Sequence, residues 1–308
     1  MLVIENLVKQ YGTLTAVNNL NLQIDAGDIM GFIGPNGAGK TTTIKMVSTL
    51  LRPTSGTIRI NGMDVQESPE EVRPIIGYMP DFFGVYEDVR VWEYLDFFAA
   101  AYKIPANNRR RMIDEALELT DLIVKREAFV SELSRGMQQR LCLAKTILHD
   151  PKLLLLDEPA SGLDPRARIE IKELLKELQR MGKTILISSH ILPELADFCN
   201  KVAIIEQGKL ITSGDVTGIM EKCRGGTVIN IRVVDRIQEA LGCLAGIPAI
   251  SDARLSEGLI SATWNGEPGD VYVVLETLVK GGFKVFSFSE EDIDLEDVFL
   301  KVTRGAVS

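Results

Sequence analysis

An eight-residue stretch, residues 34–41, has the composition and spacing of a phosphate-binding loop. It reads GPNGAGKT and fits the pattern G-x-x-x-x-G-K-[ST], with an apolar run before it and a helical pattern after it. The glycines let the backbone curl so that successive N–H groups point at phosphate oxygens. Lys40 would then reach the β- and γ-phosphates of a nucleotide, and the Thr41 hydroxyl would bind Mg²⁺. An ordinary glycine turn is the alternative, and it leaves the flanking strand and helix unexplained.

Two adjacent carboxylates follow a buried strand in LLLLDEP, residues 153–159. At the carboxyl end of a parallel strand, Asp157 would lie beside the phosphate loop and hold Mg²⁺, directly or through water. Glu158 points elsewhere and could act as the general base that polarises an attacking water. A helix-capping pair is the alternative. Because two neighbouring carboxylates are costly without a cation, we favour the metal-dependent reaction.

The chain has only two histidines, and both lie at predicted element ends. His190 ends the strand TILISSH, at the sheet edge where phosphate would lie, so we assign it a catalytic role. A strand-end histidine is otherwise a structural residue. His149 lies at a helix terminus in ILHDPK, where interaction with the helix dipole is a sufficient explanation.

The elements that must position these residues indicate an α/β fold. Residues 2–8 and 14–24 alternate as in an antiparallel sheet, whereas residues 28–34, 153–157, 184–188 and 202–206 form near-continuous apolar strands. Helical patterns cover residues 41–51, the region 91–149 and the segment between the strands at 153 and 184. Buried strands alternating with helices predict a parallel sheet covered on both faces.

A second domain is expected after Gly225 and Gly226, where the pattern changes. We predict strand 227–234, helix 236–244, strands 249–255 and 258–264, helix 270–280 and strand 283–288, followed by an amphipathic helix in DLEDVFLKVT. The order β-α-β-β-α-β is the ferredoxin-like arrangement. The sequence therefore predicts domains at 1–222 and 223–308. A dimerisation or regulatory role is favoured for the second, and a small-ligand sensor is the alternative.

One further helix start, LSRGMQQR at residues 133–140, also has the free N–H groups that favour an anion. Together with GPNGAGKT, LLLLDEP, SGLD and SSH, in this order and spacing, it resembles the ATP-binding cassette (ABC) ATPases over residues 2–220. The resemblance implies a P-loop NTPase ABC cassette, with a mixed sheet core, an antiparallel β subdomain and an α-helical subdomain. A small C-terminal α+β, ferredoxin-like domain would follow it.

In that family two cassettes pack head to tail, and each LSRGMQQR-like motif closes over the nucleotide held by the other chain. The resemblance thus implies a homodimer in which Ser134 and Gly136 contact the partner's γ-phosphate and Asp164 lies at the dimer seam. Tyr11 matches the aromatic that stacks on adenine. The expected ligands are ATP and Mg²⁺. The catalytic residues are Glu158, His190 and Lys40, and the metal-binding residues are Thr41, Asp81 and Asp157. The residues expected to bind nucleotide are Tyr11, Gly34, Pro35, Asn36, Gly37, Ala38, Gly39, Lys40, Thr41, Thr42, Asp81, Ser134, Gly136 and Asp164.

Two motifs depart from the family pattern, at three positions. The family motif is usually LSGGQ, whereas this chain has Arg135 and Met137 at its third and fifth positions. The family usually has Gln at Asp81, on the loop that touches Mg²⁺ and the attacking water. We expect Asp81 to keep the metal-sensing role with an altered charge.

The resemblance is greatest to ATPase subunits of ABC-2-type exporters, which serve a separate membrane permease. Phe82, Phe83 and Tyr86 would line the groove for a permease helix or, alternatively, pack within the helical lobe. We expect a cytoplasmic chain, peripheral on the cytoplasmic face of the membrane through the permease, because no apolar run approaches the length of a bilayer span.

The composition of the chain argues against several other classes of function. A net charge of −9 and scattered cysteines argue against nucleic-acid binding and against a cysteine metal site. A soluble ABC protein acting on ribosomes or DNA, and an ATP-sensing regulator without hydrolysis, are the alternatives. The single cassette opposes the first, and the intact Glu158 and His190 oppose the second.

Overall fold

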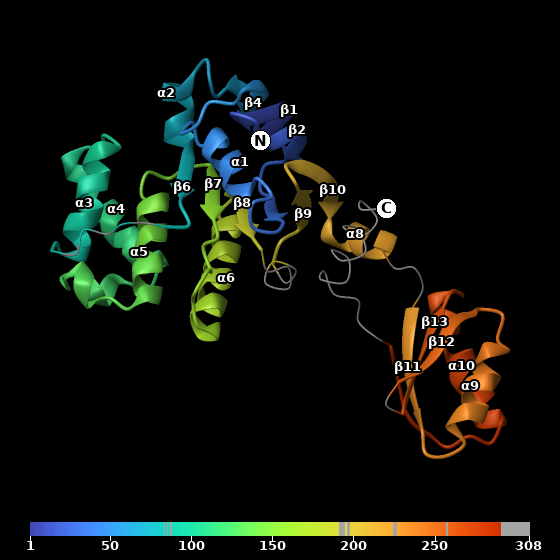
Figure 1. Ribbon diagram of the computed structural model, residues 1–308. Helices are drawn as coiled ribbons and strands as arrows, with labels where there is room; N and C mark the ends of the chain where they lie inside the picture. Colours follow the sequence, from blue (N-terminus) through green and yellow to red (C-terminus); the bar gives the residue numbers. More distant parts are fainter. Residues whose placement is uncertain are drawn as a thin grey trace. The chain divides into compact units, whose positions relative to one another are not determined.

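The computed structural model describes residues 1–82, 84, 86, 88–190, 195, 198–223, 227–256 and 258–290. The chain divides into two compact units, Met1–Val216 and Thr217–Ser308. Each unit has its own sheets and helices (Figure 1).

A six-stranded sheet forms the centre of the first unit, with the strand order β10-β9-β3-β8-β7-β6. Strands β9, β3, β8, β7 and β6 are parallel, and β10 is antiparallel to β9. Every residue of β3, β7 and β8 is buried, as expected for strands covered on both faces. The carboxyl ends of these three neighbouring strands therefore bring residues 34, 158 and 190 to one edge. The strand bounds are β3 Ile29–Ile33, β6 Ile76–Met79, β7 Leu153–Asp157, β8 Thr184–Ser189, β9 Lys201–Glu206 and β10 Lys209–Asp215.

A four-stranded antiparallel sheet, in the order β2-β1-β4-β5, packs on the same core. Its strands are β1 Leu2–Tyr11, β2 Leu14–Ile24, β4 Ser55–Ile60 and β5 Met63–Asp64. One cluster of buried side chains joins this sheet, helix α1 (Lys40–Val47) and the main sheet, through residues such as Leu20, Ile44 and Leu155. The α/β core with an antiparallel β subdomain is thus confirmed.

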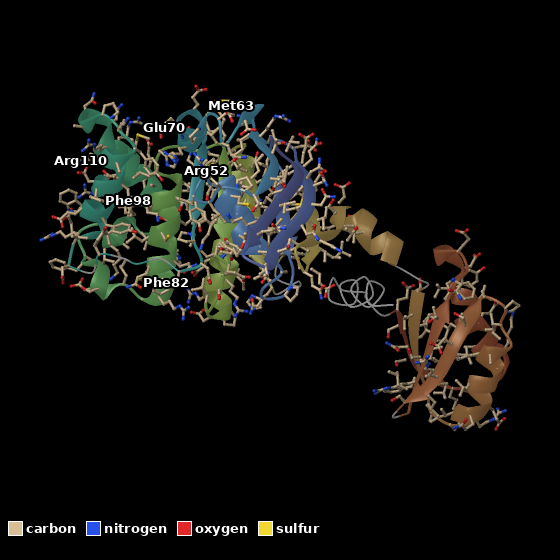
Figure 2. All side chains as sticks on the ribbon, turned by 45° about the horizontal axis from the view of Figure 1, so that its top comes forward. Arg52, Met63, Glu70, Phe82, Phe98 and Arg110 are labelled. Carbon is tan, nitrogen blue, oxygen red and sulfur yellow. The ribbon has the colours of Figure 1, made fainter. Side chains whose placement is uncertain are left out.

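The α-helical subdomain is also confirmed. Helices α3, α4 and α5 group together beside β6 in Figure 1 and contact one another. Arg110 lies at the outer edge of this group in Figure 2, and its side chain is exposed to solvent. Among the described residues, the unit also contains α2 and α6, and α8 begins at its end. The bounds are α2 Pro69–Val72, α3 Val91–Ala101, α4 Ala106–Leu119, α5 Arg135–Ile147, α6 Pro165–Arg180 and α8 Val216–Cys223, with short 3-10 helices at Arg73–Ile75, Ile123–Lys125 and Val130–Glu132.

The aromatic residues after Asp81 differ in their surroundings. Phe82 is 89% exposed (Figure 2). The Tyr86 side chain is 59% exposed, and its ring lies 6.3 Å from the Tyr94 ring and 5.8 Å from the Phe97 ring, so it packs on the surface of the helical subdomain. Phe83 lies outside the described residues.

His149 joins the helical subdomain to the main sheet. Its ring stacks on Tyr102, with centroids 3.7 Å apart, and its Nε2 donates a hydrogen bond to the carbonyl oxygen of Ile76 at 2.9 Å. The Nδ1 atom is buried and has no hydrogen-bond partner among the described residues. Packing and this hydrogen bond, rather than the helix dipole alone, therefore account for the position of His149.

We expect the first unit to become less stable at pH values lower than about 6.5, which is the ordinary pKa of histidine. Burial lowers the pKa of His149, with Lys183 opposing and Asp150 favouring its protonated form. The unfolded state therefore takes up the proton first, and the free energy of unfolding decreases as the pH falls from about 6.5 towards the folded pKa. Urea unfolding at pH 7.5 and 5.5 measures this loss. His149→Phe keeps a ring against Tyr102 and should reduce the difference between the two pH values; an unchanged difference would contradict the assignment.

The second unit has the ferredoxin-like order predicted from the sequence. Its antiparallel strands are arranged β12-β13-β11-β14. Helices α9 and α10 contribute side chains to the core cluster of the unit, including Ala240, Leu244 and Leu278. The bounds are β11 Thr227–Val233, α9 Ile237–Ala245, β12 Ile250–Ser256, β13 Leu259–Trp264, α10 Tyr272–Lys280 and β14 Val285–Glu290, with a 3-10 helix at Pro268–Asp270.

The segment DLEDVFLKVT, expected to form a last helix, lies outside the described residues. In the described part of the chain, no helix combines the length and the apolar character needed to cross a membrane.

Candidate nucleotide-binding and hydrolysis site

The loop between β3 and α1 is shaped by close backbone packing. A Cβ atom on Gly34 would overlap the carbonyl oxygen of Ile205 in β9, and Gly39 adopts a left-handed conformation with φ 104°. Lys40, only 6% exposed, points back into the loop. Its Nζ donates hydrogen bonds to the carbonyl oxygens of Gly34 at 2.6 Å and Pro35 at 3.3 Å. The loop therefore holds a buried cation at the N-terminus of α1, as phosphate binding requires.

Asp157 is almost completely buried at the end of β7. The Ser188 hydroxyl donates a hydrogen bond to its Oδ1 at 2.6 Å. Its Oδ2 is buried and has no hydrogen-bond partner among the described residues. A buried carboxylate oxygen without a partner is costly, so this atom is suited to a cation.

Glu158 connects the loop lysine to the histidine. Its Oε1 lies 3.5 Å from Lys40 Nζ, and its Oε2 lies 2.8 Å from His190 Nδ1. Its backbone has φ 50°, a left-handed conformation that is strained for a residue with a side chain. The three residues expected to be catalytic are thus in contact, and the strain occurs at the residue between the other two.

Asp81 faces the same two acidic residues. Burial raises the pKa of Asp81, and the charges of Asp157 and Glu158 raise it further. His190 and Arg135 act in the opposite direction. Three carboxyl groups with partly uncompensated charge therefore lie at this edge of the sheet.

Most of the residues expected at the site line a cleft of about 430 Å³. This volume falls within the range of small-molecule sites. Tyr11, at the end of β1, lines this cleft and is 47% exposed, and the Lys9 ammonium lies over its ring, 5.1 Å from the centroid. The lining residues are Tyr11, Leu14, Ala16, Pro35, Asn36, Gly37, Ala38, Gly39, Lys40, Thr41, Thr42, Asp81, Glu158, Ser161 and His190.

Known proteins share this architecture. Residues 17–161 match the model of a family described as ABC transporter. Nod factor export ATP-binding protein I of Burkholderia orbicola (strain AU 1054) is 35% identical over 305 residues, covering 97% of this chain and 95% of the relative. The chain belongs to the ABC transporter family. As an ABC cassette, it binds and hydrolyses ATP.

Other relatives support the same assignment. Linearmycin resistance ATP-binding protein LnrL of Bacillus subtilis (strain 168) is 28% identical, and the alignment covers 98% of both chains. A solved ATP-binding subunit of an ABC transporter is 31% identical, with a TM-score of 0.65, covering 72% of this chain and 92% of that one. A bacterial ABC transporter cassette solved as a dimer, MJ0796, is 25% identical, with a TM-score of 0.64, covering 70% of this chain and 99% of that one.

Four residues expected to contact nucleotide do not line the cleft of this ABC cassette: Gly34, Ser134, Gly136 and Asp164. The Ser134 hydroxyl caps α5 by accepting a hydrogen bond from the Met137 N–H at 3.3 Å. The Asp164 carboxylate caps α6 by accepting one from the Ala167 N–H at 3.0 Å. Gly136, in the first turn of α5, packs towards Ala167. Within one chain, these residues are placed by helix capping and packing.

The start of α5 is anchored to the segment after Glu158. The Arg135 guanidinium lies against Gly162 and leaves no room there for a Cβ atom. The Gln139 side chain donates a hydrogen bond to the carbonyl oxygen of Pro159 at 2.5 Å. Helix α5, whose start lies in LSRGMQQR, is called the signature helix below. Arg135, one of the departures from the family pattern, therefore connects the signature helix to the SGLD segment of the same chain.

Sequence reasoning missed several residues of the site. Leu14 and Ala16 line the cleft next to Tyr11, but an apolar residue at a strand start carries no distinguishing signal. Ser161 lies in SGLD, which was noticed only for Asp164. Ser188 had a usable signal, because it is a polar residue in an apolar run that the sequence predicts to form a strand covered on both faces.

Proposed function

We propose that this ABC cassette is the ATPase subunit that drives an exporter through a separate, ABC-2-type membrane permease. The contact of Lys40, Glu158 and His190 inside one cleft is the observation that carries the ATP-driven part. The export role is inferred from relatives named for export and resistance that match nearly the whole chain. The chain would act as a peripheral protein at the cytoplasmic face of the membrane, held there by the permease.

Each catalytic residue has a role that follows from its position. Lys40 would exchange its loop carbonyls for the β- and γ-phosphate oxygens and neutralise their charge. Glu158 would accept a proton from the water that attacks the γ-phosphate. His190 would hold Glu158 in position through the 2.8 Å contact and would also contact the γ-phosphate.

Thr41, Asp157 and Asp81 are proposed to hold Mg²⁺. Among the described residues, no group of three His, Cys, Asp or Glu side chains forms a metal site by itself. Nucleotide-bound Mg²⁺ needs few protein ligands, since phosphates and waters complete its octahedron. The partnerless Oδ2 of Asp157 fits this demand. Bound Mg²⁺ would neutralise charge on the β- and γ-phosphates.

A homodimer would complete each site. The signature segment has exposed Ser134 and Arg135 at the start of a helix, away from the cleft of its own chain. In a head-to-tail pair, this helix start would face the partner's nucleotide, with Ser134 and Gly136 near the γ-phosphate and Asp164 at the seam. The dimeric MJ0796 cassette supports the formation of a dimer.

The two parts of the chain would have different functions, with the boundary at about residue 222. Residues 1–222 would form the ATPase domain, and residues 223–308 an accessory domain for dimerisation or regulation. Phe82, which is 89% exposed, is the aromatic residue best placed to receive a permease helix. Tyr86, which is also exposed and contacts the Phe97 ring, would contribute to that surface.

Mixing two inactive variants tests the shared site. Lys40→Ala removes the phosphate contact in one chain, and Gly136→Glu introduces a negative charge at the signature helix start of the other. Each variant alone should lack hydrolysis. A head-to-tail heterodimer has one intact site, because both defects fall in the other site, so an equimolar mixture should recover about a quarter of the parent activity or less. A mixture as inactive as its components, although size-exclusion chromatography shows heterodimers, would contradict the arrangement.

A further inference from the structure

We propose that Ser188 is a positioning residue that orients both Asp157 and Glu158 for hydrolysis. Its hydroxyl donates a hydrogen bond to Asp157 Oδ1 at 2.6 Å and accepts one from the Glu158 N–H at 3.0 Å. Ser188 is completely buried, so water does not compete for these bonds. The inference rests on the proposed roles of Asp157 in Mg²⁺ binding and Glu158 in proton transfer.

The direction of both hydrogen bonds is determined by chemistry. A backbone N–H can only donate, so the hydroxyl oxygen must accept the bond from Glu158. The single hydroxyl proton is then left for Asp157. One side chain thus donates a hydrogen bond to Asp157 and accepts one from Glu158, the two residues of the acidic pair.

The pairing of the strands makes this geometry possible. Asp157 and Ser188 are direct partners in the parallel ladder between β7 and β8. Paired residues in such a ladder present their side chains on the same face of the sheet. The hydroxyl therefore reaches one carboxylate oxygen, Oδ1, and leaves Oδ2 as the oxygen without a partner. Ser188 thereby selects which oxygen of Asp157 is available to a cation.

The second hydrogen bond acts on the strained residue. The chain leaves β7 at Glu158 with φ 50°, and its N–H bonds to the Ser188 side chain. A left-handed conformation in a residue with a side chain persists only where its surroundings hold it. Since the same conformation directs the Glu158 side chain between Lys40 and His190, loss of the hydroxyl should disturb both metal binding and the base.

Ser188→Ala should weaken cation binding and turnover while sparing nucleotide binding. Loss of a residue that orients a metal ligand typically costs 10- to 100-fold in metal affinity or activity. We therefore expect kcat to fall by about 10- to 100-fold. The affinity for Mn²⁺, measured by electron paramagnetic resonance with a non-hydrolysable ATP analogue, should fall by about 10-fold. Analogue binding in EDTA should be unchanged. Ser188→Thr keeps the hydroxyl on a side chain suited to a strand and should restore both values.

Thr184→Ala is the matched control. Thr184 lies in the same strand, is buried, and accepts a hydrogen bond from the Gly27 N–H at 3.0 Å, at the opposite end of the strand from the cleft. Thr184→Ala therefore also removes a buried, hydrogen-bonded hydroxyl, and it should change the stability of the protein without changing kcat or Mn²⁺ affinity. Equal behaviour of the two alanine variants in all three measurements would overturn the proposal.

Two further variants separate this proposal from the one it rests on. If Asp157→Asn keeps Mn²⁺ binding or Glu158→Gln keeps turnover, the roles assigned to the acidic pair are wrong. If Asp157→Asn loses Mn²⁺ binding and Glu158→Gln loses turnover while Ser188→Ala behaves as the parent, the roles of the acidic pair stand and the positioning role of Ser188 is wrong.

Discussion

Glu158→Gln should abolish ATP turnover and leave ATP binding intact. General-base catalysis contributes about 10²- to 10⁴-fold, and glutamine cannot accept the proton of the attacking water, so kcat should fall by at least about 100-fold. The amide has the size of the carboxylate and can still contact His190. The cleft therefore keeps its shape, and binding of a fluorescent ATP analogue should stay within a few-fold of the parent.

The same variant should reveal the closed dimer. With ATP bound and not hydrolysed, the ligand shared by two cassettes persists, so size-exclusion chromatography in Mg·ATP should show a dimer that the parent forms only transiently. Glu177→Gln, on the exposed side of α6, removes a carboxylate outside the cleft and serves as the control. Turnover near the parent value in Glu158→Gln would mean that another group, such as Asp81, accepts the proton.

Gly34→Ala should damage both the phosphate loop and the stability of the first unit. An added Cβ would overlap the carbonyl oxygen of Ile205 and lie 3.1 Å from the Ala38 Cβ, so the loop or β9 must move. Overpacking in a dense core costs about 1–3 kcal/mol, and here the obstacle is backbone, which yields least. Displaced N–H groups would also lose their alignment on phosphate. We expect ATP affinity to fall by at least about 10-fold, which corresponds to about 1.4 kcal/mol.

Gly37→Ala is the control within the same loop. Its Cβ would meet nothing within 4 Å, and its cost is limited to the left-handed backbone at φ 82°. That cost is about 1–2 kcal/mol. The chain has two tryptophans, Trp92 in the first unit and Trp264 in the second. Urea unfolding followed by fluorescence in a Trp264→Phe background therefore reports the first unit alone. Equal stability and ATP affinity in Gly34→Ala and the parent would show that the close approach to Ile205 is not required.

Local patterns were enough to predict most elements of both units. The apolar run before Gly34 and the acidic pair after residue 156 identified β3 and β7, because a strand buried on both faces needs an unbroken apolar run. The period of the apolar residues separated helices from strands in the ferredoxin-like unit, since the two structures repeat every 3.6 and every 2 residues. Lys40 was predictable from the pattern G-x-x-x-x-G-K-[ST], and Glu158 and His190 were predictable because each follows a strand that an apolar run defines.

The contacts among these residues were decided by the tertiary structure. Asp157 and Ser188 are separated by 31 residues, and only the register of β7 on β8 makes them partners. The left-handed conformation of Glu158 and the contact of Arg135 with Gly162 depend equally on distant segments. The sequence by itself determined which chemical groups are present and which elements carry them. Side-chain direction and strand register arise from long-range packing, so the structure alone decided that one serine bridges the acidic pair and that the signature helix lies outside the cleft of its own chain.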